Sequence, residues 1–387
     1  MVEWLPSSAN AGSLHIVQSA ASFNFENNEK IWWIPITVKL IYLDSATGEI
    51  MLGEVRNLGY LNESKRNFTL NGIPGKEIKG AVFNIDRKIY CRSKYQPQIQ
   101  TLISSTLKSN QNFLSCSERI GMILDLVALV EMGRLQVGPY PEIWLNQHFG
   151  FLISETSLNV LKGSLVAIKR LANYLRRDKA VMDWIVYLID RKAKHLSWEV
   201  PNQNHAFFDI REELFSAGVW AGSAELFASA KGYFKATLGG SDIVHPSLKK
   251  FVYIAALVNG TQADVDILWE SAQISLSLDK VIGIVSNELS FESHDVFRLF
   301  KLVKSEDLSS VVIQMTSATG GHKHFWNYLI KQNQWQLGSK FELLVEECVS
   351  LMDDTELLNQ ASGIDSIAVK RGLERNPNLQ KHFTAVG

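Results

Sequence analysis

The sequence predicts a mainly α-helical protein, in which a small N-terminal β-sandwich precedes a large α-solenoid of stacked antiparallel helix pairs. Two observations predict this fold class. Up to about residue 95, apolar residues alternate or form short β-branched runs, which is the pattern of strands. Beyond that point they recur three and four positions apart, which is the pattern of helices. With 387 residues the chain is long enough for two domains, which we place at 1–95 and 96–387.

The N-terminal region contains six or seven short runs of the strand type. The clearest cover residues 14–17, 31–43, 49–55, 67–70, 81–85 and 88–91. Turn-forming pairs such as Asn71-Gly72 and Pro74-Gly75 separate them, because glycine reaches left-handed backbone conformations and proline fixes φ. Short strands with such frequent turns are typical of a small β-sandwich.

The clearest helix of the sequence covers residues 115–133. Ser115 can cap its first turn while Glu118, three positions later, reaches back to the cap, and Gly133 supplies a left-handed end. Apolar residues surround most of its circumference, so we expect this helix to be buried on several sides. The same signals predict a helix that begins with Thr261 and Asp264 and runs through Ile274, and another helix over 308–315.

From residue 96 to the end, about fifteen or sixteen helical segments follow one another with short connections. A single bundle seldom grows to this size, whereas stacked helix pairs of roughly 40 residues bury each pair against its neighbours. We therefore expect a curved α-solenoid. No residue motif recurs at a fixed period, so the repeat is one of structure and not of sequence.

Charge and composition exclude several classes of protein. The 39 Lys and Arg residues are balanced by 40 Asp and Glu residues, so we expect no nucleic-acid partner. The longest apolar runs, 122–130 and 251–258, are less than half of the roughly 20 residues that a membrane helix needs, so we expect no membrane. The three cysteines, Cys91, Cys116 and Cys348, are far apart and are expected to be reduced thiols, which favours a cytoplasmic location.

A search for catalytic chemistry finds no motif. The sequence has no His-Glu-x-x-His, no Gly-x-Ser-x-Gly and no phosphate-binding glycine pattern. His322 and His324 are close neighbours, but two positions apart on a helix they point in different directions, so a surface or capping role is favoured over metal binding. Cys116 begins a helix and is interpreted as structural. We therefore predict no catalytic, cofactor-binding or metal-binding residue.

The remaining candidates also have structural interpretations. Glycines within 218–222 and 238–240 are expected to end helices and not to bind phosphate. The acidic pairs Glu346-Glu347 and Asp353-Asp354 are typical of solvated helix faces. The densest basic stretch, 169–179, has acidic residues near it, so a functional basic patch is the less favoured interpretation.

The order of these features resembles a known family. A sandwich entered through Ile-Trp-Trp-Ile-Pro-Ile-Thr at 31–37 leads to a helix that fits the pattern Leu-Ser-x-x-Asp-Arg-x-x-Leu-x-x-Asp-x-x-Ala-Leu-x-x-x-Gly. The residues that fit are Leu114, Ser115, Arg119, Asp125, Ala128, Leu129 and Gly133. Weaker similarities follow at 211–215, 245–249 and 326–335. The chain is similar to the C-terminal half of the zinc aminopeptidases of the aminopeptidase N and puromycin-sensitive aminopeptidase family, nearest to its cytosolic, fungal-like branch.

Three departures from the family pattern stand out, and one is that the family's Asn-Trp near the end is spread as Asn333-Gln334-Trp335. Glu118 occupies the position of the first Asp, and the Gly-Tyr-Tyr-Arg turn that leads out of the family's sandwich appears as Ile89-Tyr90-Cys91-Arg92. None of the family's zinc ligands, its general base or its amino-terminus-binding Glu has a matching position in this chain. The resemblance therefore implies a zinc enzyme as the parent but assigns no catalytic residue here.

The resemblance implies a specific role for residues 96–387. In such enzymes the helical bowl closes over the active site of the catalytic domain and encloses the peptide substrate. We therefore expect this chain to be a non-catalytic C-terminal fragment whose partners are the peptide and the parent's catalytic domain. The isolated fragment is expected to self-associate through the face that the catalytic domain covers. The alternative is an aminopeptidase-like scaffold without catalysis that binds a peptide, a nascent chain or a protein through its solenoid.

Overall fold

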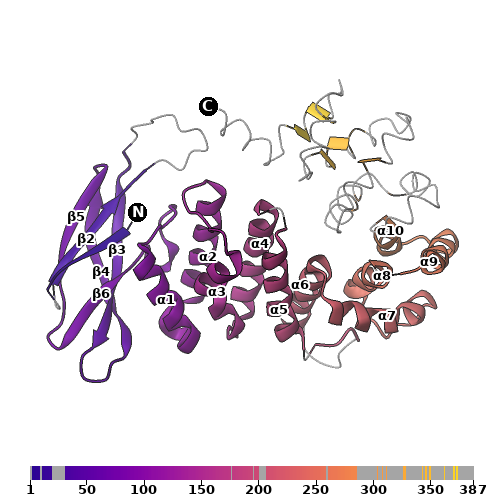
Figure 1. Ribbon diagram of the computed structural model, residues 1–387, viewed down its shortest axis with the longest axis horizontal. Helices are drawn as coiled ribbons and strands as arrows, with labels where there is room; N and C mark the ends of the chain where they lie inside the picture. The colour runs from indigo at the N-terminus through magenta and orange to yellow at the C-terminus, as the bar shows by residue number, and fades with distance from the viewer. Residues whose placement is uncertain are drawn as a thin grey trace. The chain divides into compact units, whose positions relative to one another are not determined.

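The computed structural model describes residues 2–8, 11–19, 31–175, 177–194, 196–199, 206–258 and 260–285, with isolated positions between 303 and 373 (Figure 1). This part of the chain is mostly helical, with a small β-sandwich at its N-terminal end, as the sequence predicts. Contacts within the chain divide it into two compact units, Met1–Trp184 and Ile185–Gly387, and each is described by itself. The division into domains at 1–95 and 96–387 stays a prediction.

Two antiparallel sheets of three strands each form the sandwich, with the strand orders β1-β2-β5 and β4-β3-β6 (Figure 1). Residues alternate between burial and exposure along the strands: Leu14 and Ile16 of β2 and Ile36 and Val38 of β3 are buried. Such alternation places one face of each sheet in the core. The strands are β1 (Val2–Ser8), β2 (Ala11–Val17), β3 (Ile34–Asp44), β4 (Ile50–Leu61), β5 (Lys65–Asn71) and β6 (Lys76–Phe83).

The strand predictions need two corrections. Residues 88–91 were expected to form a strand, but they lie in a loop that follows a short 3-10 turn, η1 (Ile85–Arg87). The cause is Asn84, whose side-chain amide bonds both the N–H and the carbonyl of Ile89 and so replaces the partners of a ladder. In addition, β1 was not predicted. It contains Pro6 and pairs only with β2 among the described strands, and proline is tolerated in such an edge strand.

Four helices follow the strands in the first unit. The predicted helix is confirmed as α2, with a capping box in which Ser115 accepts from the N–H of Glu118 while the Glu118 carboxylate accepts from the N–H of Ser115. Gly133 ends it with φ 66°. Helix α2 is buried on several sides and packs against α4, while α1 packs against α3. The helices are α1 (Pro97–Ser109), α2 (Cys116–Glu131), α3 (Pro141–Phe149) and α4 (Leu158–Tyr174). Helix α5 (Lys179–Ala193) crosses the division between the units.

The second unit is built around α8, in which Phe251–Leu257 are all buried. Helices α6, α7, α9 and α10 contact it. The helix predicted from Thr261 to Ile274 is confirmed as α9, with Thr261 and Asp264 as its capping box. The predicted helix at 308–315 lies outside the described residues except for Val311. The bounds are α6 (Ala206–Ala221), α7 (Ala224–Leu238), α8 (Lys249–Val258), α9 (Gln262–Ile274) and α10 (Leu278–Val285). Among the described helices, none has the length and apolar character to cross a membrane.

One buried histidine makes the stability of the first unit depend on pH. His148 of α3 is 8% exposed, and its ring centroid lies 4.6 Å from that of Trp144. Burial lowers the pKa of His148 to about 4. In the unfolded chain this histidine has its ordinary pKa of about 6.5. As the pH falls from about 6.5 to about 4, the unfolded chain therefore binds a proton at His148 and the folded chain does not.

We expect the free energy of unfolding to fall as the pH is lowered from about 6.5 towards 4, with part of this loss due to His148. The variant His148→Phe keeps an aromatic ring against Trp144 but has no titrating group, so its loss of stability over this range is expected to be smaller. Urea unfolding followed by circular dichroism at several pH values measures the difference. Equal pH dependence in the two proteins would contradict this account of His148.

Candidate functional site

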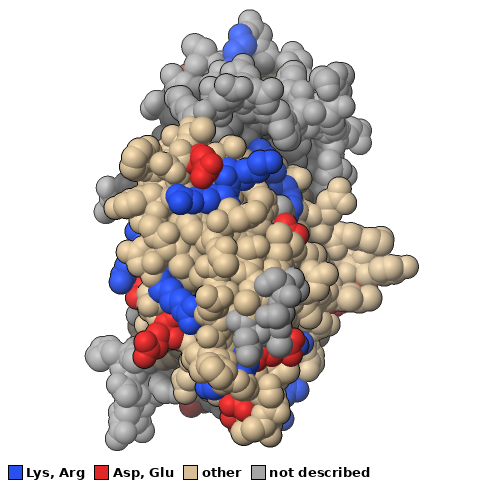
Figure 2. All heavy atoms as spheres, turned by 90° about the vertical axis from the view of Figure 1, so that its left-hand side faces the viewer, with Lys and Arg blue, Asp and Glu red and all other residues tan. Residues whose placement is uncertain are grey.

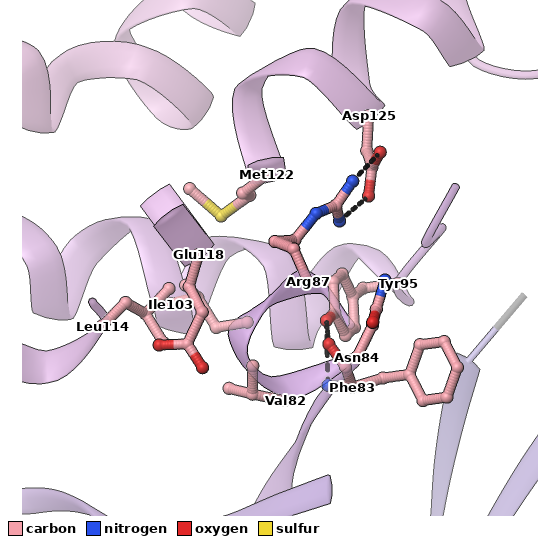
Figure 3. A pocket seen from close by; sticks show the side chains of 10 residues that line it. All are labelled: Val82, Phe83, Asn84, Arg87, Tyr95, Ile103, Leu114, Glu118, Met122 and Asp125. Carbon is pink, nitrogen blue, oxygen red and sulfur yellow. Dashed lines mark hydrogen bonds and ion pairs between the residues drawn. The ribbon is translucent and has the colours of Figure 1, made fainter. Parts of the chain in front are cut away.

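The residues that carry the family resemblance meet the segment that leads from the sandwich to the helices. This segment, residues 84–93, follows β6 and crosses α2, and we call it the strap. Arg87 of the strap points towards Asp125 of α2 and is joined to it by two hydrogen bonds (Figure 3). The predicted capping residue Glu118 lies on the same helix and contacts the strap as well. The candidate site is therefore a junction between strap and helix.

The backbone of the strap is strained. Asn84, Asp86 and Arg87 have φ values of 58°, 57° and 57°, in the left-handed region that residues other than glycine seldom adopt. Each such residue costs roughly 1–2 kcal/mol relative to the right-handed conformation. The side chain of Asn84 offsets part of this cost, because it donates to the carbonyl of Ile89 and accepts from its N–H at 2.9 Å each.

The carboxylate of Asp125 is the point on which the strap converges. Only 2% of this side chain is exposed, and it accepts hydrogen bonds from Arg87 Nη2 at 2.7 Å, from Arg92 Nη1 at 3.2 Å and from the N–H of Ser93 at 3.0 Å. Burial alone would lower the pKa of Arg87, but its hydrogen bonds to Asp125 and the charge of that carboxylate raise it. The raised pKa keeps the Arg87 guanidinium charged, and its two hydrogen bonds make the contact with Asp125 bidentate.

Glu118 makes a second connection between α2 and the chain before it. Its carboxylate accepts from the N–H of Ser115 at 2.8 Å, as the capping box requires, and from the N–H of Asp86 in the strap at 3.4 Å. The ammonium of Lys39 in β3 lies 3.8 Å from the same carboxylate. One side chain thus caps a helix and contacts both the strap and the sheet.

A cavity of about 20 Å³ lies beneath the strap (Figure 3). Val82, Ile103, Leu114 and Met122 supply apolar walls, and Tyr95 closes one side, where its hydroxyl exchanges hydrogen bonds with the backbone of Phe83. A volume of this size holds about one water molecule and no peptide. The pocket beside the motif is therefore part of the packing and has no room for a substrate.

Arg119, the next residue of the resemblance, is also structural. Its guanidinium is buried and pairs with the buried carboxylate of Glu155 at 2.8 Å. It also donates to the carbonyls of Gln111 and Leu114, at 2.5 Å and 2.6 Å. Because these carbonyls belong to the segment just before α2, Arg119 ties the chain's entry into the helix to the loop after α3.

The residues of the weaker family similarities in the second unit also bind backbone groups. Arg211 of α6 is buried and donates to the carbonyls of Ser197 and Glu199, at 2.8 Å and 2.7 Å. The ring Nδ1 of His245 accepts from the backbone N–H of Ser247, and the backbone N–H of His245 donates to the carbonyl of Trp198. Both residues hold the short segment 197–199 in place. Of the range 326–335, only Trp326 and Asn327 belong to the described residues.

The structure places the other candidates raised by the sequence as follows. Cys116 is exposed, and its Sγ lies 3.4 Å from the hydroxyl of Ser157. Gly222 ends α6 with φ 89° and Gly240 follows α7 with φ 81°, as expected for helix ends. In the basic stretch, Arg170 pairs with Glu131 and Lys179 with Asp183. His322, His324, Glu347, Asp353 and Asp354 lie outside the described residues.

The described residues do not fit the zinc ion that the resemblance implies for the parent enzyme. Within these ranges, His, Cys, Asp and Glu side chains form no group of three that could hold a metal. The buried carboxylates near the junction are matched with cations: Asp125 with Arg87 and Arg92, and Glu155 with Arg119. We therefore derive no chemical step through a metal in this part of the chain.

The pattern search missed Gly121, which the junction requires. A Cβ atom added at this position in α2 would lie 2.3 Å from Nε and 2.4 Å from Cδ of Arg87. Only glycine lets the arginine cross the helix closely enough to reach Asp125. Its signal in the sequence was an isolated glycine in the interior of a strong helix, which often marks a close approach.

The chain matches a known protein family. The family model described as ERAP1-like C-terminal domain matches residues 81–363, which is more than half of the chain. The matched range begins in β6, just before the strap, and contains α1 and all later helices described above. No curated protein matches the chain significantly.

The variant Gly121→Ala tests the close approach of Arg87 to α2. Alanine favours helix by about 1 kcal/mol over glycine, but here its Cβ displaces the guanidinium, so we expect a net loss of stability of about 1–3 kcal/mol. Gly232→Ala in α7 is the matched control, because its added Cβ meets nothing within 4 Å and is expected to stabilise the protein by up to about 1 kcal/mol. Chemical denaturation measures both changes. Stabilisation by both substitutions would show that Gly121 is not required.

Proposed function

Because the chain belongs to the ERAP1-like C-terminal domain family, we propose that it is the non-catalytic C-terminal portion of a zinc aminopeptidase. It carries a C-terminal domain of an aminopeptidase-family protein. The proposed parent removes N-terminal residues from peptides, and the helical region of this chain closes over the active site of the catalytic domain and encloses the peptide. We place the parent in the cytosolic, fungal-like branch of the family.

The family match carries this proposal, and the geometry of the junction supports it. The residues that fit the aminopeptidase pattern bind backbone groups and one another: Asp125 holds the strap, Arg119 holds the entry to α2, and Arg211 holds segment 197–199. Side chains used in this way keep helices and connections in register. This is the contribution expected from the enclosing part of an enzyme whose reacting groups lie elsewhere.

An exposed apolar face on the sandwich supports a large partner. Trp33 is 73% exposed, and Tyr60 and Val55 of β4 are each 54% exposed. The rings of Trp33 and Tyr60 lie 6.1 Å apart, so the face is continuous at this point. Contiguous exposed apolar residues mark interaction sites. We propose that the parent's catalytic domain covers this face, and that the isolated chain self-associates through it.

The surface charge and the cysteines bear on two further parts of the proposal, the partner class and the cytoplasmic location. On the face in Figure 2, Lys and Arg groups lie next to Asp and Glu groups, and broad areas carry no charge. A nucleic-acid partner needs a clustered basic surface, so we propose none. Cys91, Cys116 and Cys348 form no disulfide, which suits a cytoplasmic protein.

Two measurements on the purified chain test the proposal. With zinc present, it is expected to release no chromophore from leucine and alanine p-nitroanilides. Fluorescently labelled ten-residue peptides are expected to show a saturable rise in anisotropy. Acetylation of the peptide's amino terminus should leave this binding unchanged, because the group that would hold the terminus is not in the chain.

Either measurement can contradict the proposal. Hydrolysis that a chelator abolishes would show that this chain has its own active site. An absence of peptide binding at millimolar peptide would show that the helices do not enclose substrate and would favour a scaffold that binds a protein partner.

A further inference from the structure

We propose that the strap, residues 84–93, opens and closes as a unit over the cavity beneath it, and that the carboxylate of Asp125 is the anchor that keeps it closed. This inference concerns a conformational device in the fold and does not depend on the proposed enzymatic parent. Three observations carry it: the strain in the strap, the convergence of its contacts on one side chain, and the apolar cavity that it covers.

The strain supplies a force for opening. The left-handed conformations of Asn84, Asp86 and Arg87 are clustered within four residues, and none of the three is glycine. Strained backbone of this kind persists only where surrounding contacts hold it. If those contacts are lost, the backbone can relax to ordinary conformations, and the strap would leave its present position.

Most of the hydrogen bonds between the strap and α2 converge on Asp125, and the carboxylate of Glu118 accepts one more from the N–H of Asp86 at 3.4 Å. Two arginines and one backbone N–H, from Arg87, Arg92 and Ser93, bind the two oxygens of this carboxylate. Asp125 is therefore the main anchor on α2, and its release would free both ends of the segment 87–93. The close crossing of Arg87 over Gly121 keeps the guanidinium aligned with the carboxylate.

Opening of the strap would change access to the cavity beneath it. Arg87 and Asn84 form part of its lining on the strap side, and Val82, Ile103, Leu114 and Met122 supply apolar walls (Figure 3). Glu118 and Asp125 of α2 line it as well. When the strap opens, these walls become accessible from the surface. The device would thus expose an apolar pocket that the closed state reduces to the size of one water molecule.

Cys91 is a natural reporter, because it belongs to the strap and is half-buried in the closed state. Its Sγ lies 3.6 Å from the side-chain nitrogen of Asn84. The test measures the rate at which iodoacetamide alkylates each cysteine of the full chain, with mass spectrometry to identify the site. The decisive variant is Arg87→Gln, which removes the main partner of the anchor from the strap side.

A closed strap and an open strap predict opposite changes in the alkylation rate of Cys91 in Arg87→Gln. Burial raises the pKa of Cys91, and the charge of Arg87 lowers it. If the strap stays closed, the loss of Arg87 leaves less thiolate and alkylation of Cys91 becomes slower. If the strap opens, access improves and alkylation becomes faster, by at least about fivefold. An unchanged or slower rate would overturn the proposal.

The other two cysteines control for unfolding. Cys116 is exposed and should react at the same rate in both proteins, while Cys348 is buried and should remain unreactive. A parallel rise at Cys348 would show global unfolding and would also overturn the proposal. Arg170→Gln is the matched control variant, because it breaks the ion pair of α2 with α4 at Glu131, and it should leave Cys91 unchanged.

A second variant tests the role of strain without touching the anchor. The side chain of Asp86 is exposed, and within the described part of the chain it forms an ion pair with Lys88 alone, at 3.5 Å. Asp86→Gly therefore removes little else than the strain at φ 57°. We expect alkylation of Cys91 to become two- to fivefold slower in Asp86→Gly. We also expect this change to reverse part of the effect of Arg87→Gln in the double variant. An unchanged or faster rate in Asp86→Gly would show that the strain does not drive opening.

Discussion

The bidentate contact between Arg87 and Asp125 is the interaction on which the arrangement of the first unit depends. It joins the end of the sandwich to α2. It also holds three left-handed residues that would not keep this conformation alone. A buried carboxylate of this kind is stable only with its partners, since loss of one partner leaves an uncompensated charge away from water. The neighbouring contacts follow from this one. Glycine is needed at position 121, Glu118 turns towards the strap, and Tyr95 closes the cavity behind it.

These contacts give the charged residues of the aminopeptidase-like pattern a structural interpretation. Arg119 and Asp125 are charged residues in a fixed order, a property often associated with catalysis. In this chain each is paired with a charge of opposite sign and with backbone groups, and their task is to connect elements that are close in space and distant in sequence. The pattern therefore identifies the family through its architecture.

Local signals predicted much of the fold. Ser115, Glu118 and Gly133 act within one helix, so their spacing alone predicted both ends of α2, and the same is true of Thr261 and Asp264 in α9. Predictions failed where distant contacts decide the outcome. Residues 88–91 have the composition of a strand, but the side chain of Asn84 and the carboxylate of Asp125 place the segment in a loop. The role of Gly121 depends on an arginine 34 positions earlier in the chain, and no pattern within one helix contains that information.

The central claim is that the aminopeptidase-like helix serves to hold the strap, and a double-mutant cycle between Arg87→Gln and Asp125→Asn measures this most directly. The free energies of unfolding of the wild-type chain, both single variants and the double variant give the coupling between the two side chains. For a bidentate pair with one partner buried, we expect a coupling of about 2 kcal/mol. A coupling below about 0.5 kcal/mol, the size found for independent sites, would contradict the account.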